Sequence, residues 1–76
     1  MSVIVYSKPD CPQCDSTKRD LEILGIDYTA VDLMQDRGAL QRLLGLGFRS
    51  VPVVETANGS WSGYDRDRIK ALLSFA

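Results

Sequence analysis

The N-terminal part of the chain alternates between strand and helix patterns, and this alternation narrows the possible folds sharply. Val3–Tyr6 is an unbroken run of β-branched and aromatic residues, which is typical of a strand buried on both faces. Pro12–Leu24 has a helical spacing of apolar residues and ends at Gly25, where a left-handed cap belongs. Tyr28–Asp32 is a second strand pattern. Because strand–helix–strand crossovers are right-handed, we expect these two strands to be parallel.

The rest of the chain predicts a second helix, a hairpin and a third helix. The expected bounds are Asp36–Leu44 for the helix, Val51–Glu55 and Ser60–Ser62 for the strands, and Asp65–Ser74 for the last helix. Asn58-Gly59 favours a type I′ hairpin turn. Each of these helices has an apolar side that is expected to face the core. It consists of Leu40, Leu43 and Leu44 in the second helix and of Ile69, Leu72 and Leu73 in the third. The order β-α-β-α-β-β-α predicts an α/β fold, a four-stranded mixed sheet covered by three helices.

Composition indicates one small globular domain, residues 1–76, and excludes several classes of function. Nine basic and ten acidic residues leave a net charge of −1, unlike the basic surface of a nucleic-acid or anionic-membrane binder. The sequence has no apolar run long enough for a transmembrane helix. Its N-terminus lacks the basic region and cleavage site of a signal peptide. We therefore expect a cytoplasmic protein.

Two cysteines lie at the junction of the first strand and first helix, in the motif Cys11-Pro12-Gln13-Cys14. Pro12 suits the first helical position, which makes Cys11 the N-cap. An N-cap side chain accepts from the N–H groups two and three residues on, and the helix dipole adds about half a positive charge there. Both effects favour a thiolate at Cys11, the attacking species in disulfide exchange. Lys8 would strengthen this effect and Asp10 would oppose it, according to where their side chains point.

The spacing of the cysteines favours redox chemistry. Cys14 shares a helix face with Leu21 and Leu24, so we expect it to be less exposed than Cys11. Cys11 would attack a substrate disulfide and Cys14 would resolve the mixed disulfide. A bridge across four residues would contribute only about 1.9 kcal/mol of chain entropy, which makes it a poor structural staple. The alternatives are two incidental buried thiols, or a zinc or iron–sulfur site shared by two chains, since this chain has no histidine.

With these motifs the sequence resembles the glutaredoxin family of the thioredoxin fold over essentially its whole length. The resemblance rests on the Cys11–Cys14 motif, on Ser50-Val51-Pro52 before the third strand, and on a glycine-containing turn before the last helix. It implies that Cys11 is the nucleophile and Cys14 the resolving cysteine. It also implies that Pro52 is a cis-proline beside the dithiol, whereas its plainer interpretation is a residue at a strand edge. The backbone of Val51 would then contact an extended substrate.

Within that family the sequence is most similar to the NrdH-redoxins. Gln13 stands where typical glutaredoxins have tyrosine, Trp61-Ser62-Gly63-Tyr64 resembles the subfamily's Trp-Ser-Gly-Phe, and Asp67-Arg68-Ile69 continues the match. NrdH-redoxins take electrons from thioredoxin reductase and pass them to class Ib ribonucleotide reductase. The resemblance therefore implies two partners, thioredoxin reductase and the large subunit of class Ib ribonucleotide reductase. It also implies a monomer that has no bound cofactor or metal. NADPH would supply electrons indirectly, through the reductase. The implied partner-binding residues are Lys8, Pro12, Gln13, Val51, Pro52, Trp61, Ser62, Gly63 and Tyr64.

Some residues favour glutathione as the electron source instead. Pro12 is the typical glutaredoxin residue, and Ser50-Val51-Pro52 resembles the Thr-Val-Pro of glutaredoxins. Tyr64-Asp65 could stand in for the Cys-Asp with which glutaredoxins hold the glutathione amine, although Asp65 also suits a helix N-cap. Trp61 is equally well explained as a core residue. A glutathione-dependent glutaredoxin is therefore the alternative function, with the same dithiol chemistry.

Overall fold

The computed structural model describes residues 2–75, so Met1 and Ala76, the ends of the expected 1–76 domain, lie outside the described residues. The elements are β1 (Val3–Ser7), α1 (Pro12–Ile23), β2 (Thr29–Asp32), α2 (Arg37–Gly45), β3 (Val53–Thr56), β4 (Gly59–Ser62), α3 (Arg66–Ala71) and a final 3₁₀ turn (Leu72–Phe75). This is the order expected from the sequence. Across the described residues, every helix is too short or too polar to cross a membrane.

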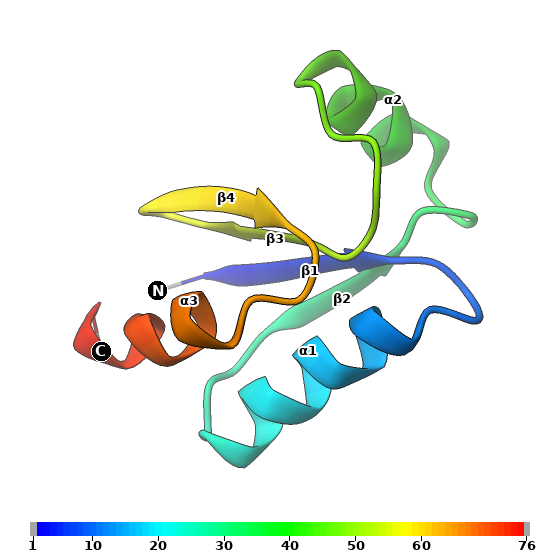
Figure 1. The fold of residues 1–76 in the computed structure, drawn as a ribbon. Helices are drawn as coiled ribbons and strands as arrows, with labels where there is room; N and C mark the ends of the chain where they lie inside the picture. The colour runs from blue at the N-terminus through cyan, green and yellow to red at the C-terminus, as the bar shows by residue number, and fades with distance from the viewer. Residues whose placement is uncertain (1, 76) are drawn as a thin grey trace.

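The four strands form one mixed sheet in the order β2-β1-β3-β4 (Figure 1). β1 and β2 are parallel, with Val5 opposite Ala30, and β1 pairs with β3 in the antiparallel sense. β3 and β4 form the antiparallel hairpin. Helices α1 and α3 lie on one side of the sheet and α2 lies on the other (Figure 1). The predicted four-stranded mixed sheet with three helices is confirmed, and it is a thioredoxin-like fold.

Each face of the sheet has its own apolar cluster. The cluster under α1 and α3 consists of Val3, Val5, Leu21, Val54, Ile69 and Leu72. The cluster under α2 consists of Tyr6, Leu33, Leu43 and Val53. Val53 and Val54 belong to different clusters because successive side chains of a strand point to opposite faces. The sheet is therefore buried on both faces. Accessible functional residues are expected in the loops at the ends of the strands.

The start of β3 and the hairpin turn differ from the sequence prediction. β3 begins at Val53, not Val51, and the Val51–Pro52 peptide before it is cis. A proline cannot donate to a strand ladder, so Pro52 does not extend the strand. The prediction of a type I′ turn at Asn58-Gly59 is wrong, because that turn needs a positive φ at both central residues and the φ of Asn58 is not positive. Gly59, with φ +133°, is instead the first residue of β4 and pairs with Thr56.

Two leucines expected in the core are exposed. Leu44 is 45% exposed, because the neighbouring Leu43 takes the core-facing position of α2 and successive helical residues are turned by 100°. Leu73 is 47% exposed. The predicted single helix Asp65–Ser74 ends at Ala71, and the following 3₁₀ turn rotates each residue by 120°, so Leu73 points away from the core that Leu72 enters.

A polar cluster joins α2 to the sheet. The guanidinium of Arg42 donates to both carboxylate oxygens of Glu55, at 3.0 and 3.2 Å, and Tyr6 donates its hydroxyl hydrogen to Glu55 at 2.9 Å. The hydrogen bond from Arg42, and then that from Tyr6, lower the pKa of Glu55 below its usual value. The ionised carboxylate is therefore favoured by the fold.

This cluster predicts a loss of stability in acid. Because the pKa of Glu55 is lower in the folded chain, its contribution is present above the ordinary carboxyl pKa and is lost as the pH falls through the folded value. Between pH 6 and pH 3 the Tm of the wild type should therefore fall further than that of Glu55→Gln, measured by circular dichroism. Asp27→Asn serves as the control, since Asp27 is exposed. Parallel Tm curves for wild type and Glu55→Gln would contradict the prediction.

Candidate active site

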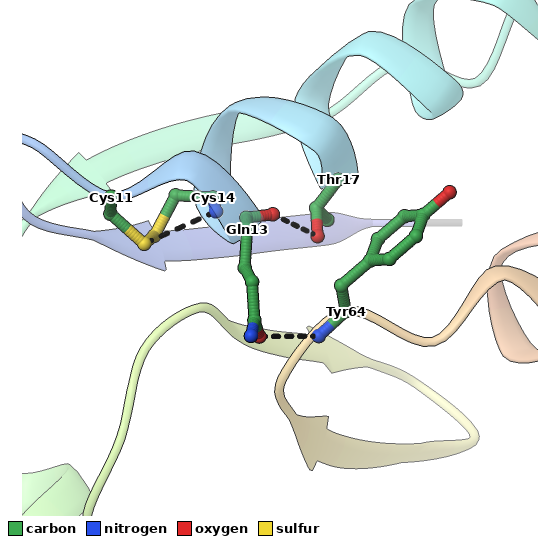
Figure 2. The surroundings of a disulfide bond; sticks show 5 residues. All are labelled: Cys11, Gln13, Cys14, Thr17 and Tyr64. Atoms are coloured by element: carbon green, nitrogen blue, oxygen red, sulfur yellow. Dashed lines mark hydrogen bonds between the residues drawn. A yellow bond between two sulfur atoms is a disulfide. The ribbon is translucent and has the colours of Figure 1, made fainter.

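Cys11 occupies the N-cap of α1, as the sequence predicts. Its backbone is extended, with φ −120° and ψ 95°, and Pro12 begins the helix. The Cys14 N–H donates to Cys11 Sγ at 3.1 Å, and the two cysteines are joined in a disulfide (Figure 2). Of the two N–H groups expected to face this sulfur, the structure therefore shows the one from Cys14. The loop before it turns at Asp10, whose φ of +59° is tolerated by an aspartate.

The two cysteines differ in exposure. Cys14 is 1% exposed and lies on the buried face of α1 with Thr17 and Leu21, so its expected burial is confirmed. Cys11 is partly exposed. The Thr17 hydroxyl donates to the Gln13 carbonyl at 2.9 Å, so its burial leaves no unpaired hydroxyl. A substrate disulfide can thus reach Cys11 from solvent, whereas Cys14 is buried behind Cys11.

The segment before β3 lies beside the dithiol. The Val51–Pro52 peptide is cis, as the family resemblance implied, and the Gly63 N–H donates to the Pro52 carbonyl at 2.8 Å. Pro52 is buried, whereas Val51 is partly exposed. A shallow depression of about 340 Å³ is lined by Lys8, Asp10, Cys11, Pro12, Gln13, Arg49, Ser50 and Val51. It brings together Cys11 and four of the predicted partner-binding residues.

An apolar groove of about 230 Å³ adjoins this depression on the α2 side. Its apolar lining consists of Leu33, Met34, Leu40, Leu43, Leu44, Phe48, Val51 and Val53, and it shares Lys8, Arg49, Ser50 and Val51 with the depression. Met34 and Leu44 at this groove are 67% and 45% exposed. Exposed apolar side chains near Cys11 therefore lie toward α2. Arg49 borders both hollows, but a single arginine in a loop gave no signal of this position.

The β4–α3 loop is attached to α1 at two points. The Tyr64 N–H donates to Gln13 Oε1 at 3.2 Å (Figure 2). The Tyr64 hydroxyl donates to the carboxylate of Asp20, and this hydrogen bond is the main cause of the raised pKa of Tyr64. Asp20 was not foreseen as part of this region, because 44 residues separate it from Tyr64 and no local pattern links them.

The remaining predicted residues do not line the depression. Trp61 packs against the apolar cluster under α1 and α3, with the Arg68 guanidinium 5.6 Å from its ring centroid. Within residues 2–75 its indole nitrogen is buried and has no hydrogen-bond partner. Ser62 is exposed and pairs with Val53 on β3. Trp61 thus supports the core, and a direct role for either residue in partner binding stays a prediction.

The difference in exposure predicts unequal alkylation of the reduced protein. Substoichiometric iodoacetamide should modify Cys11 well before Cys14, since Cys11 is partly exposed at the N-cap of α1 and Cys14 is buried. Peptide mapping by mass spectrometry after a short reaction at pH 7 measures the ratio. The control is the same reaction in denaturant, where both thiols should react alike. Preferential labelling of Cys14 in the folded protein would contradict the assignment.

Comparison with known proteins agrees with this geometry. The glutaredoxin family profile matches residues 3–60. The chain is 38% identical over 72 residues to the glutaredoxin-like protein NrdH of Escherichia coli, covering 95% of this chain and 89% of that protein. It is 35% identical to the gene 56 protein of Mycobacterium phage L5, covering 96% and 73%. The solved structure of E. coli NrdH-redoxin superposes with a TM-score of 0.93 at 38% identity, covering 95% of each chain. With its Cys11–Cys14 pair at the head of α1, the chain belongs to the glutaredoxin family and, within it, to the NrdH-redoxins, and it is a thiol–disulfide oxidoreductase.

Proposed function

We propose that this protein carries electrons from thioredoxin reductase to class Ib ribonucleotide reductase. The observation that carries the proposal is the dithiol itself, in which an accessible Cys11 caps α1 and a buried Cys14 lies behind it. The similarity to NrdH proteins supports the choice of ribonucleotide reductase as the electron acceptor. The large subunit of that enzyme would present the disulfide to be reduced.

The electron transfer is a pair of thiol–disulfide exchanges. The Cys11 thiolate attacks one sulfur of the substrate disulfide, forming a mixed disulfide and releasing the other substrate sulfur as a thiolate. Cys14 then loses its proton and attacks Cys11 Sγ. This releases the second substrate sulfur and leaves the Cys11–Cys14 disulfide seen in the structure. The substrate gains two electrons and two protons, and the carrier loses the same number.

The cycle closes when thioredoxin reductase returns two electrons from NADPH to the Cys11–Cys14 disulfide. The carrier itself needs no bound cofactor or metal for these steps, because sulfur is both nucleophile and leaving group. We place the reaction in the cytoplasm, where thiols are kept reduced, and expect the carrier to act as a monomer.

One contact supports thioredoxin reductase over glutathione as the electron source. Asp65, the residue that could hold the glutathione amine, accepts from the Arg68 N–H at 3.0 Å as the N-cap of α3. Its second carboxylate oxygen lies 3.5 Å from Arg68 Nε. Since Arg68 already occupies this carboxylate, a glutathione amine would have to compete with it.

The proposal is tested by reconstituting the whole electron path. Class Ib ribonucleotide reductase, thioredoxin reductase, NADPH and this protein should together form deoxyribonucleotide, and product should fall to background when the protein is omitted or replaced by Cys11→Ser. A wild-type protein that supports no product formation would overturn the proposal. Bound zinc or iron in place of two titratable thiols per chain would favour the metal-sharing alternative instead.

A further inference from the structure

The side-chain amide of Gln13 has one end fixed and one end free. Its oxygen accepts the Tyr64 N–H at 3.2 Å, which directs the amide nitrogen Nε2 away from Tyr64 (Figure 2). Among the described residues, no hydrogen bond from this nitrogen is found. Gln13 is exposed and lines the same depression as Cys11 and Val51. A hydrogen-bond donor with a set orientation therefore borders the place where a substrate disulfide must dock.

Two contacts keep the side-chain amide of Gln13 from turning over. A flipped amide would place its NH₂ group against the Tyr64 N–H, donor against donor, and lose the existing bond. Tyr64 is itself held by its hydroxyl, which donates to Asp20 on the same helix as Gln13. The orientation of Nε2 is thus set before any substrate arrives.

We propose that Gln13 is a specificity residue, whose Nε2 donates a hydrogen bond to a main-chain carbonyl beside the disulfide of a protein substrate. A main-chain carbonyl is an acceptor that every extended peptide offers, so the contact favours polypeptide disulfides over small ones. This inference deepens the proposed function and rests on it in one respect: the substrate is a protein disulfide.

The expected effect is a change in substrate preference. Loss of one neutral hydrogen bond should slow the reaction with a protein disulfide roughly three- to tenfold. A small disulfide without a peptide carbonyl should lose nothing. The ratio of the two rate constants is therefore the informative quantity, because a general disturbance of Cys11 would change both rates alike.

Three variants separate the donor from other effects. Gln13→Met removes the donor without adding charge. Gln13→Glu keeps an oxygen for the Tyr64 N–H but replaces the donor with an acceptor, and the small disulfide reports the effect of its added charge. Gln41→Glu makes the same chemical change at an exposed position of α2 that lines neither hollow.

The test uses pre-reduced protein mixed with insulin or with hydroxyethyl disulfide, quenched with acid and analysed by mass spectrometry. We expect the insulin-to-small-disulfide ratio to fall roughly three- to tenfold in both Gln13 variants and to stay unchanged in Gln41→Glu. Equal slowing with both substrates, or no change in the ratio, would overturn the proposal. No reductase takes part, so failure of the proposed electron path would appear only in the reconstituted assay and leave this result intact.

Discussion

Cys14→Ser should remain covalently attached to its substrate. In this variant Cys11 still attacks the substrate disulfide, but no second thiol lies behind it to release the mixed disulfide. Multiple turnover should therefore stop, and a stable adduct should accumulate to about one substrate per chain. Non-reducing electrophoresis and intact mass measure the adduct, and dithiothreitol should dissolve it.

The matched variant is Cys11→Ser. A serine hydroxyl at the N-cap is a poor nucleophile without an adjacent base, so this variant should form no adduct and should lose disulfide reduction entirely. Serine is also a good N-cap, so α1 should stay folded. If Cys11→Ser trapped substrate and Cys14→Ser did not, the roles of the two cysteines would be reversed.

Leu21→Ala should destabilise the protein severely. Leu21 is fully buried where α1 packs on the sheet, and removing such a side chain costs about 2–5 kcal/mol. A domain of 76 residues is expected to be stable by roughly 4–11 kcal/mol, so the loss is a large part of the total. Urea unfolding measured by circular dichroism gives the change in the free energy of unfolding.

Ile23→Ala provides the control for this experiment. Ile23 lies on the same helix but is 73% exposed, so its truncation should change the free energy of unfolding by no more than about 0.5 kcal/mol. A similar loss in both variants would mean that α1 does not use Leu21 as its anchor on the sheet.

The fold was predictable because its signals are local. The β-branched run at Val3–Tyr6 and the apolar spacing of the first helix identify the β-α-β unit from short stretches of sequence. The position of Cys11 followed from the preference of proline for the first helical turn, and the structure has Pro12 there. The burial of Cys14 followed from the helical period alone.

Features that depend on distant partners were not predictable in this way. The bond from Tyr64 to Asp20 joins residues 44 apart, and the orientation of Gln13 depends on the same loop. For Trp61 the sequence left a partner-binding role and a core role equally open, and the ring packs on the core cluster. The hairpin turn lies one residue earlier than predicted. The pairing of Thr56 with Gly59 determines the register of the hairpin, and the residues of the turn alone do not determine it.

The identity of the electron donor tests the account most directly. NADPH consumption is followed during reduction of insulin by this protein, once with thioredoxin reductase and once with glutathione and glutathione reductase, with Cys11→Ser as the blank in both. We predict NADPH consumption with thioredoxin reductase and none above the blank with glutathione. Turnover with glutathione alone would contradict the account and would make the protein a glutathione-dependent glutaredoxin.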